Sequence, residues 1–303
     1  MEWYKLVFKQ KQPIHVGSAK WGVVKETEIF ISGSTMWGAL TNVYLQDKQD
    51  EINTNDENKL KEIGKYFETT SNFFPSFDGK TALQPTYQKG EFGYLLPDTN
   101  EFLSEDKFRF YFVDTLVQTA VEPISRKAKD ESLHELDYIL PKPKQNLENF
   151  KDNLYWIGII QIEDNKKEFL EEHLTSIFVG ADVRYGYGEL ELINAEKLKN
   201  NYEEFWLVKN TNNDNNDDDD NNNIEMEIKT KNPSPYFIEV EENLEIEGEI
   251  FLIPEIDFRE NTPKLTDAKF FASIGSEIKN SSEDFELSKG KLIIKENQNA
   301  NST

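Results

Sequence analysis

The stretch Leu154–Ile162 (Leu-Tyr-Trp-Ile-Gly-Ile-Ile-Gln-Ile) limits the possible folds of this chain more than any other feature. It is apolar at odd and even positions alike. Successive side chains of a strand point to opposite faces of a sheet, so this run predicts a central strand that is covered on both sides. The fold therefore needs further elements packed above and below one sheet.

The residues after this strand predict a helix over 165–178, a glycine-rich loop and a strand over 187–193. The loop reads Gly180-Ala181-Asp182-Val183-Arg184-Tyr185-Gly186-Tyr187-Gly188. Such a loop can offer backbone N–H groups and a guanidinium to phosphates, and tyrosine rings to bases. The alternative is a purely structural helix C-cap followed by a tight turn.

Upstream, the sequence predicts a helix over 34–46 that Ser34 or Thr35 caps, with Met36, Trp37, Leu40, Val43 and Tyr44 on one face. The free N–H groups of its first turn, beside Gly33, form a possible anion site. Other segments are assigned from composition and periodicity: a strand at 3–9, a loop at 18–28, a helix at 56–69, an irregular insertion with short strands at 71–105, a strand at 108–113 and a protruding loop or hairpin at 118–137.

The six clearest elements follow one another as strand, helix, strand, strand, helix and strand. This order predicts an α+β fold with a ferredoxin-like, RRM-like βαββαβ core. We expect the four-stranded sheet to keep one open face, which RNA-recognition modules use to stack bases.

Charge is distributed unevenly along the 303 residues, whose formal net charge is −23. Residues 1–200 carry 24 Lys and Arg against 33 Asp and Glu, and the remainder carries 10 against 24. This balance argues against non-specific DNA binding by the whole chain but leaves room for a local basic groove. The chain has no cysteine, no long apolar run and no secretory signal, so we expect a cytoplasmic protein without disulfides or thiolate metal sites.

Composition predicts three parts. Residues 1–210 form the ferredoxin-like domain, and residues 211–223, rich in Asn and Asp, form a disordered linker. Residues 224–303 alternate in short runs and predict a β-rich acidic extension with an exposed acidic face. The acidic linker lacks the glycine and the closing glutamate of an EF-hand loop, so we expect no metal site there.

Three motifs occur in an order that resembles the repeat-associated (RAMP) superfamily of CRISPR-associated proteins. They are the strand end Pro13-Ile14-His15-Val16-Gly17-Ser18, the helix entrance Ile31-Ser32-Gly33-Ser34-Thr35-Met36-Trp37-Gly38-Ala39-Leu40 and the loop from Gly180 to Gly188. The chain departs from the family pattern at Ser32, where relatives carry proline, and at Trp37, where relatives carry a basic residue. The resemblance covers residues 1–194.

The resemblance implies a subunit of a type III CRISPR effector ribonucleoprotein that binds guide RNA (crRNA). Phe73-Phe74-Pro75-Ser76-Phe77 and the segment from Arg126 to Leu133 are similar to the subunit that caps the 5′ repeat-derived handle. Its implied partners are the guide RNA, a large polymerase-like subunit and backbone RAMP subunits, with no membrane contact and no cofactor. Two alternatives remain, a backbone-type subunit or a RAMP endoribonuclease that cleaves target or precursor RNA.

The resemblance also implies candidate residues for RNA contact and for RNA cleavage. Asp130 is the candidate for metal-dependent cleavage, assisted by His134, while His15 is either a general base for a ribose 2′-hydroxyl or a hydrogen-bonded structural group. No metal ligand set is expected. The candidate RNA contacts are His15, Ser32, Gly33, Ser34, Thr35, Arg126, Lys127, Lys129, Gly180, Arg184, Tyr185, Gly186, Tyr187 and Gly188.

Overall fold

The computed structural model describes most of the chain. The described residues are 1–50, 52, 56–147, 150, 153–198, 204–206, 208–210, 224–226, 233–240, 244–257, 262–279 and 285–295. The predicted linker at 211–223 lies outside them, so that prediction and the domain boundaries drawn from it stay untested. Within the described residues, no helix has both the length and the apolar character needed to cross a membrane.

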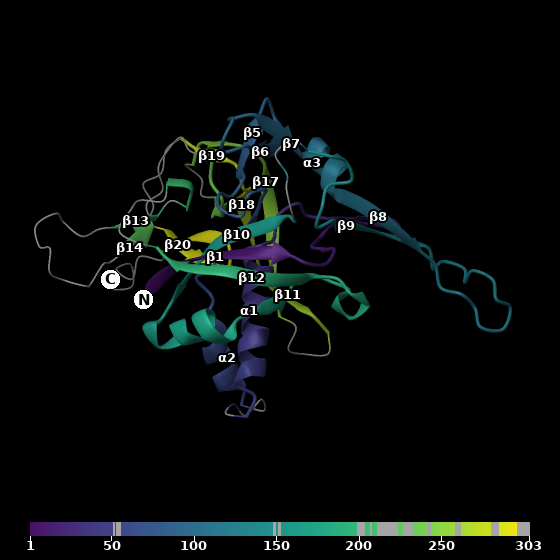
Figure 1. Ribbon diagram of the computed structural model, residues 1–303, viewed down its shortest axis with the longest axis horizontal. Coiled ribbons are helices and arrows are strands. Elements are labelled where there is room, and N and C mark those ends of the chain that lie inside the picture. Colours follow the sequence, from purple (N-terminus) through teal and green to yellow (C-terminus); the bar gives the residue numbers. More distant parts are fainter. Residues whose placement is uncertain are drawn as a thin grey trace, which may run out of the picture.

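A five-stranded antiparallel sheet forms the centre of the molecule (Figure 1). Its strands, in spatial order, are β11 (Ser176–Phe178), β12 (Glu189–Lys197), β1 (Glu2–Gln10), β10 (Tyr155–Ile162) and β4 (Phe74–Ser76). The order β12-β1-β10-β4 is that of a ferredoxin-like βαββαβ core, so the predicted fold class is confirmed. The predicted strands at 3–9, 154–162 and 187–193 are all present.

The predicted strand at 108–113 is wrong. Glu105–Phe112 forms helix α3, which Ser104 caps by accepting a hydrogen bond from the Lys107 N–H. The aromatic run was typical of a strand, yet Phe108 and Phe112 are four residues apart and are the two side chains that the helix buries. The short strand β4, inside the predicted irregular insertion, takes the second strand position of the core instead.

Helices α1 (Gly33–Asp47) and α2 (Glu57–Lys65) lie below the sheet in Figure 1. The cap of α1 is Ser32, two or three residues earlier than predicted. The predicted helix at 165–178 ends early. It consists of a 3-10 turn, η1 (Asp164–Lys166), and a π-helical turn, η2 (Phe169–His173), after which the chain extends into β11.

Both faces of the two central strands are buried, and the expected open face is therefore wrong for β1 and β10. Leu6 and Phe8 are buried on one side of β1, and Trp3 and Val7 on the other. In β10 every residue from Trp156 to Ile160 is buried. The apolar character at both parities of 154–162 predicted this cover correctly, and bases cannot stack on the middle of the sheet.

A second sheet, in the order β2-β3-β9-β8, projects from the core. Its strands are β2 (Gly17–Trp21), β3 (Val24–Thr27), β8 (Val113–Gln118) and β9 (His134–Ile139). The predicted loop at 18–28 is therefore mostly a hairpin. The predicted protruding hairpin at 118–137 is confirmed, since β8 and β9 pair from Val113–Ile139 to Gln118–His134 and extend away from the body (Figure 1).

The remaining elements form smaller sheets around this core. Strands β5 (Gln84–Gln88), β6 (Glu91–Leu95) and β7 (Phe102–Ser104) lie above the central sheet in Figure 1. The C-terminal region is β-rich, as predicted. It contains η4 (Glu204–Trp206), β13 (Val208–Asn210), β14 (Ile224–Met226), β16 (Ile246–Glu247) paired with β19 (Glu277–Ile278), and a sheet of β17 (Ile250–Asp257), β18 (Lys264–Ala272), β15 (Phe237–Glu239), β21 (Lys291–Ile294) and β20 (Phe285–Ser288).

Candidate nucleic-acid interface

The glycine-rich loop is fixed to the segment that follows β1. The Ala181 N–H donates to the His15 carbonyl at 3.0 Å, and the Gly188 N–H donates to the Pro13 carbonyl at 2.8 Å. A Cβ atom on Gly180 would lie 2.0 Å from the His15 carbonyl oxygen. Glycine is thus required at Gly180 for a close backbone approach and for its φ of +77°. The loop and the motif at 13–18 form one structural unit.

His15 connects this unit to the projecting sheet. Its imidazole is buried, and Nδ1 lies 2.7 Å from the Asp137 carbonyl oxygen of β9. Ile14 pairs with Ile139 of the same strand through two backbone hydrogen bonds. A buried ring that is held in this way has little access to a ribose hydroxyl, so the geometry favours the structural alternative for His15.

Residues 180–186 of the loop are exposed, and they include the carboxylate of Asp182. Arg184 and Tyr185 lie among them in the 3-10 turn η3 (Val183–Tyr185). Tyr185 is 82% exposed. Arg184 is exposed and forms no ion pair within the described residues. Tyr187 differs because its ring packs edge-on against Tyr138 of β9, with the centroids 5.7 Å apart, and burial raises the pKa of its hydroxyl. A base can therefore stack on Tyr185 more readily than on Tyr187.

The predicted contacts Arg126, Lys127 and Lys129 lie on the exposed loop that closes the β8–β9 hairpin. Backbone hydrogen bonds shape this loop, from Lys129 N–H to the Ala120 carbonyl and from Arg126 N–H to the Glu122 carbonyl. The three cations therefore stand at the far end of the projection, away from the glycine-rich loop (Figure 1).

Asp130 is exposed in the same hairpin loop. His134 contacts the Gln118 side chain through Nε2 and the Ser132 carbonyl through Nδ1, each at 3.1 Å. The one group of potential metal ligands in the described part of the chain lies elsewhere, at Glu168, Glu172 and His173. The last of these already pairs with Asp47 at 2.8 Å. Metal-dependent cleavage at Asp130 stays an untested prediction.

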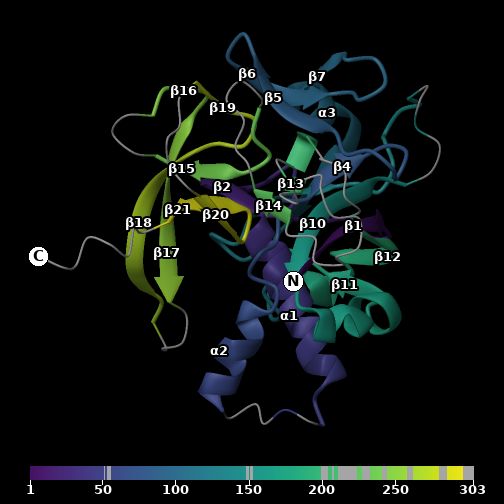
Figure 2. The ribbon, with the colours of Figure 1, turned by 90° about the vertical axis from the view of Figure 1, so that its left-hand side faces the viewer.

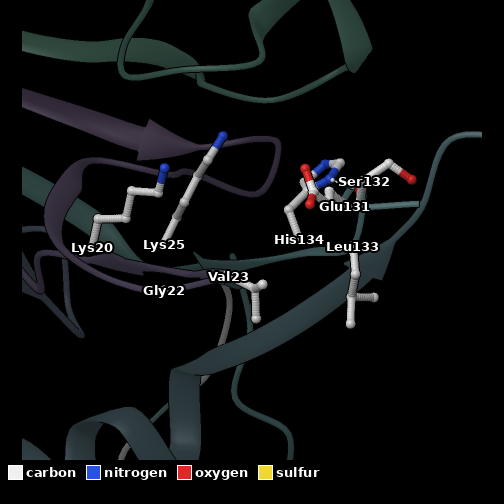
Figure 3. A pocket seen from close by; sticks show the side chains of 8 residues that line it. All are labelled: Lys20, Gly22, Val23, Lys25, Glu131, Ser132, Leu133 and His134. Atoms are coloured by element: carbon white, nitrogen blue, oxygen red, sulfur yellow. Dashed lines mark hydrogen bonds between the residues drawn. The ribbon is translucent and has the colours of Figure 1, made fainter. Parts of the chain in front are cut away.

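A cavity of about 350 Å³ opens where the β2–β3 turn meets the base of the hairpin loop (Figure 3). Lys20 and Lys25 are directly opposite each other in the β2–β3 ladder, and both side chains extend to the same side of the hairpin. Neither forms an ion pair among the described residues. Two like charges in this register repel each other, and a bound anion would relieve that repulsion. His134 and Glu131 complete the polar wall.

Lys20 and Lys25 were not recognised as candidates from the sequence. They are five residues apart, and their proximity depends on a two-residue turn at Gly22 and Val23. The signal that would have revealed them is Gly22 between two short β-type runs, which is typical of a hairpin.

The entrance of helix α1 is largely covered. The Gly33 N–H donates to Asn72 Oδ1 at 2.9 Å, the Met36 N–H to the Ser32 carbonyl at 3.0 Å and the Thr35 N–H to Ser32 Oγ at 3.3 Å. A Cβ atom on Gly33 would lie 2.3 Å from the Gly290 nitrogen. The entrance thus lies beneath the Lys289–Gly290 turn. Ser34 is exposed, and RNA contact by Ser32, Gly33, Ser34 or Thr35 stays a prediction.

Solved structures share this architecture. Chains in cryo-EM structures of the type III-B Cmr-beta bound to cognate target RNA, one of them also with AMPPnP, match with a TM-score of 0.56 and 14% sequence identity. Each match covers 91% of this chain and 86% of the other. A match over 91% of the 303 residues includes part of the C-terminal β-rich region. At this identity the likeness establishes the fold.

The sequence gives the family. No curated protein matches the chain, but the sequence model of the RAMP superfamily matches residues 8–191, which is more than half of its length. The matched range contains the glycine-rich loop, the motif at 13–18 to which it is bound and the α1 entrance. The chain is a member of the RAMP superfamily.

Proposed function

We propose that this protein binds the guide RNA of a type III CRISPR effector complex and caps its 5′ repeat-derived handle. The observation that carries the proposal is the joint between the glycine-rich loop, the segment 13–16 and β9. This joint presents Arg184 and Tyr185 to solvent on a rigid backbone. A guanidinium beside an exposed aromatic ring is a pairing suited to a single-stranded phosphate backbone with unstacked bases.

The positions of the cations support an RNA interface that runs from the glycine-rich loop along the projecting β2-β3-β9-β8 sheet. Arg184, Lys20 and Lys25 lie in the two segments that flank the 13–16 and β9 joint, and Arg126, Lys127 and Lys129 stand at the hairpin tip. With both central strand faces buried, RNA would follow this interface and not the middle of the central sheet. In a chain of net charge −23, these exposed cations offer the positions where a polyanion can approach, although the carboxylates of Asp182, Asp130 and Glu131 lie among them.

The capping role rests on the resemblance of residues 73–77 and 126–133 to the handle-capping subunit. The solved Cmr-beta structures are described as bound to target RNA, which makes a ribonucleoprotein the natural setting for this chain as well. Neighbouring backbone RAMP subunits and a large polymerase-like subunit are its proposed protein partners.

The test is site-specific photocrosslinking in the assembled complex. A photoreactive phenylalanine analogue replaces Tyr185, and the complex is purified through a tag on this subunit. Capping predicts that the crosslinked nucleotides belong to the constant 5′ part of short guide RNAs. Crosslinks confined to the variable part of the guide would overturn capping and favour a backbone position, while a complex without RNA would overturn the whole proposal.

A pair of double variants tests whether Arg184 and Tyr185 contact the guide RNA. Arg184→Ala with Tyr185→Ala removes a charged donor and a stacking ring, and we expect affinity for guide RNA to fall by at least tenfold. Lys61→Ala with Lys65→Ala, on the exposed side of α2, serves as the control and should change affinity less than twofold.

A further inference from the structure

The ribbon formed by β17 and β18 exposes an apolar face. Every second residue of β17 lies on this face together with its cross-strand partner in β18. Leu252 is opposite Phe270, and Pro254 is opposite Ala268. Ile250, Leu252, Leu265 and Phe270 are each 52–65% exposed, and Pro254 and Ala268 are exposed as well. No charged side chain interrupts this set in the described residues. We call it the β17–β18 apolar face.

The charged residues of the ribbon have the opposite parity. Glu255 is opposite Asp267, and Lys269 pairs with Glu239 at 2.7 Å. On that same side Phe271 is buried against the rest of the C-terminal sheet. An antiparallel strand pair with one solvated face normally turns its polar side to water. Glu255, Asp267 and Lys269 are exposed as well, so the outer part of the ribbon has two solvated faces. One carries these charged side chains, and the other is the β17–β18 apolar face.

The ribbon lies at the border of the molecule, at the left of Figure 2. β17 is the end strand of its sheet and pairs only with β18 among the described residues. Pro254 lacks an N–H, and the β18 register shifts opposite Glu255 and Ile256. Both features hinder the addition of another strand to this edge. A partner would therefore pack onto the apolar face rather than extend the sheet.

This chain offers little to cover the face itself. The two longest stretches outside the described residues are 211–223, composed of Thr, Asn and Asp, and 296–303, whose one apolar residue is Ala300. RNA is also a poor occupant, because the face has no cation and is bordered by the carboxylates of Glu249, Glu255 and Asp267. A second copy would bring the same acidic border and a net charge of −23 against its own.

We propose that the β17–β18 apolar face docks a different protein subunit, one that presents an apolar surface bordered by lysine and arginine. Exposed contiguous apolar surface marks protein interaction sites, and the acidic border selects a basic rim on the partner. The proposal depends on the proposed function only in taking that partner from the effector complex. It assigns to the C-terminal region a role in assembly that is separate from RNA contact.

The chain has no cysteine, so one introduced thiol reports on one position. Leu252→Cys reports on the apolar face, and Lys61→Cys on α2 is the control. The rate of maleimide labelling is measured by mass spectrometry of the corresponding peptide, in the isolated protein and in the complex purified through a tag on this chain. We expect labelling of Leu252→Cys to slow at least tenfold in the complex, and that of Lys61→Cys to change less than twofold.

A second measurement uses Leu252→Gln and Phe270→Gln, which alter exposed side chains and should leave the melting temperature unchanged. Each should reduce the protein subunits that co-purify by at least fivefold. Equal labelling rates of Leu252→Cys in the free protein and in the complex would overturn the proposal, as would recovery of the chain without any protein partner. Slow labelling of the isolated chain together with a dimeric mass would also overturn it, in favour of a second copy.

These outcomes separate the two proposals. A complex that protects Leu252→Cys but contains no RNA supports the docking face and overturns the proposed function. A complex that carries guide RNA and leaves Leu252→Cys fully reactive supports RNA binding and overturns the docking face.

Discussion

The backbone N–H of Gly33, the first residue of α1, donates a 2.9 Å hydrogen bond to the side-chain oxygen Oδ1 of Asn72. The amide nitrogen of Asn72 donates in turn to the carbonyls of Pro235 and Gly290, at 2.9 and 3.0 Å. Asn72 is fully buried. One side chain thus links the N-terminal helix, the central sheet and the C-terminal region, and the predicted N-terminal and C-terminal parts share an apolar core.

Asn72→Ala should destabilise the whole protein. The change leaves the Gly33 N–H and the Pro235 carbonyl without a partner, and the Gly290 carbonyl keeps only its bond from the Phe237 N–H, at a cost of about 3 kcal/mol in the free energy of unfolding. The melting temperature should fall by roughly 5–10 °C in a calorimetric scan. Asn194→Ala, at an exposed position of β12, is the control and should shift it by less than about 2 °C. Equal effects of the two variants would contradict the role of Asn72.

Gly180 and Gly186 form a matched pair within one loop. Both have positive φ, +77° and +87°, but a Cβ atom meets the His15 carbonyl oxygen at 2.0 Å in the first and nothing within 4 Å in the second. Gly186→Ala should cost about 1 kcal/mol in unfolding free energy from backbone strain alone. Gly180→Ala should cost about 1–3 kcal/mol more because the backbones must separate. Urea titration measures both unfolding free energies. Equal decreases for the two variants would show that the close approach of Gly180 to the His15 carbonyl does not affect stability.

The Lys20 and Lys25 pair predicts a specific salt dependence. If both ammonium groups contact phosphates, replacing them with glutamine should reduce the slope of log K against log salt by about 1.4 for single-stranded RNA. Guide RNA affinity is measured by fluorescence anisotropy between about 50 and 200 mM salt. Lys61→Gln with Lys65→Gln removes the same charge from α2 and should leave the slope unchanged. A slope that responds equally to both double variants would exclude the cavity as a phosphate site.

Glu28 predicts a pH-dependent stability. Burial, partly offset by a hydrogen bond from Ser18, raises the pKa of its carboxyl above the usual value of 4.5. The folded protein therefore holds this proton more tightly than the unfolded chain does, and the ionised carboxylate destabilises the fold. This penalty is absent below pH 4.5, begins as the pH rises through that value and is complete above the raised pKa.

Glu28→Gln keeps a hydrogen-bonding side chain and removes the charge. Its melting temperature should exceed that of the wild type at pH 7, and the difference should vanish near pH 4. Glu101→Gln, at an exposed loop position, provides the reference. A wild type that is more stable than Glu28→Gln at pH 7 would show that attraction to Arg109 outweighs burial.

The βαββαβ core was accessible from the sequence because its strands carry strong local signals. The run from Leu154 to Ile162 is apolar at both parities, and the helix after Ser32 has a clear apolar stripe. The open sheet face was a wrong inference for β1 and β10, since cover on the second face comes from segments far away in the sequence. Trp206 and Phe74, for example, have ring centroids 6.1 Å apart across 132 positions of the chain.

The local errors have local causes. Phe108 to Val113 has the composition of a strand, but Ser104, Glu105 and Asp106 supply a helix cap and an acidic first turn. The two buried side chains, Phe108 and Phe112, are four residues apart, which is a helical spacing. The candidate site was found in part because glycine and arginine are conspicuous in the loop from Gly180 to Gly188. The contribution of Lys20 and Lys25 depends on strand register, which a sequence pattern specifies weakly in a short polar hairpin.

The bonds of Asn72 also constrain when this molecule can become complete. Its partner Gly290 lies 218 residues further along the chain, and it is synthesised about ten seconds or more after Asn72 at ordinary translation rates. Until then the side-chain amide nitrogen of Asn72 lacks one or both of its carbonyl partners, Pro235 and Gly290. The joint between α1, the central sheet and the C-terminal region therefore closes only after Gly290 has been synthesised.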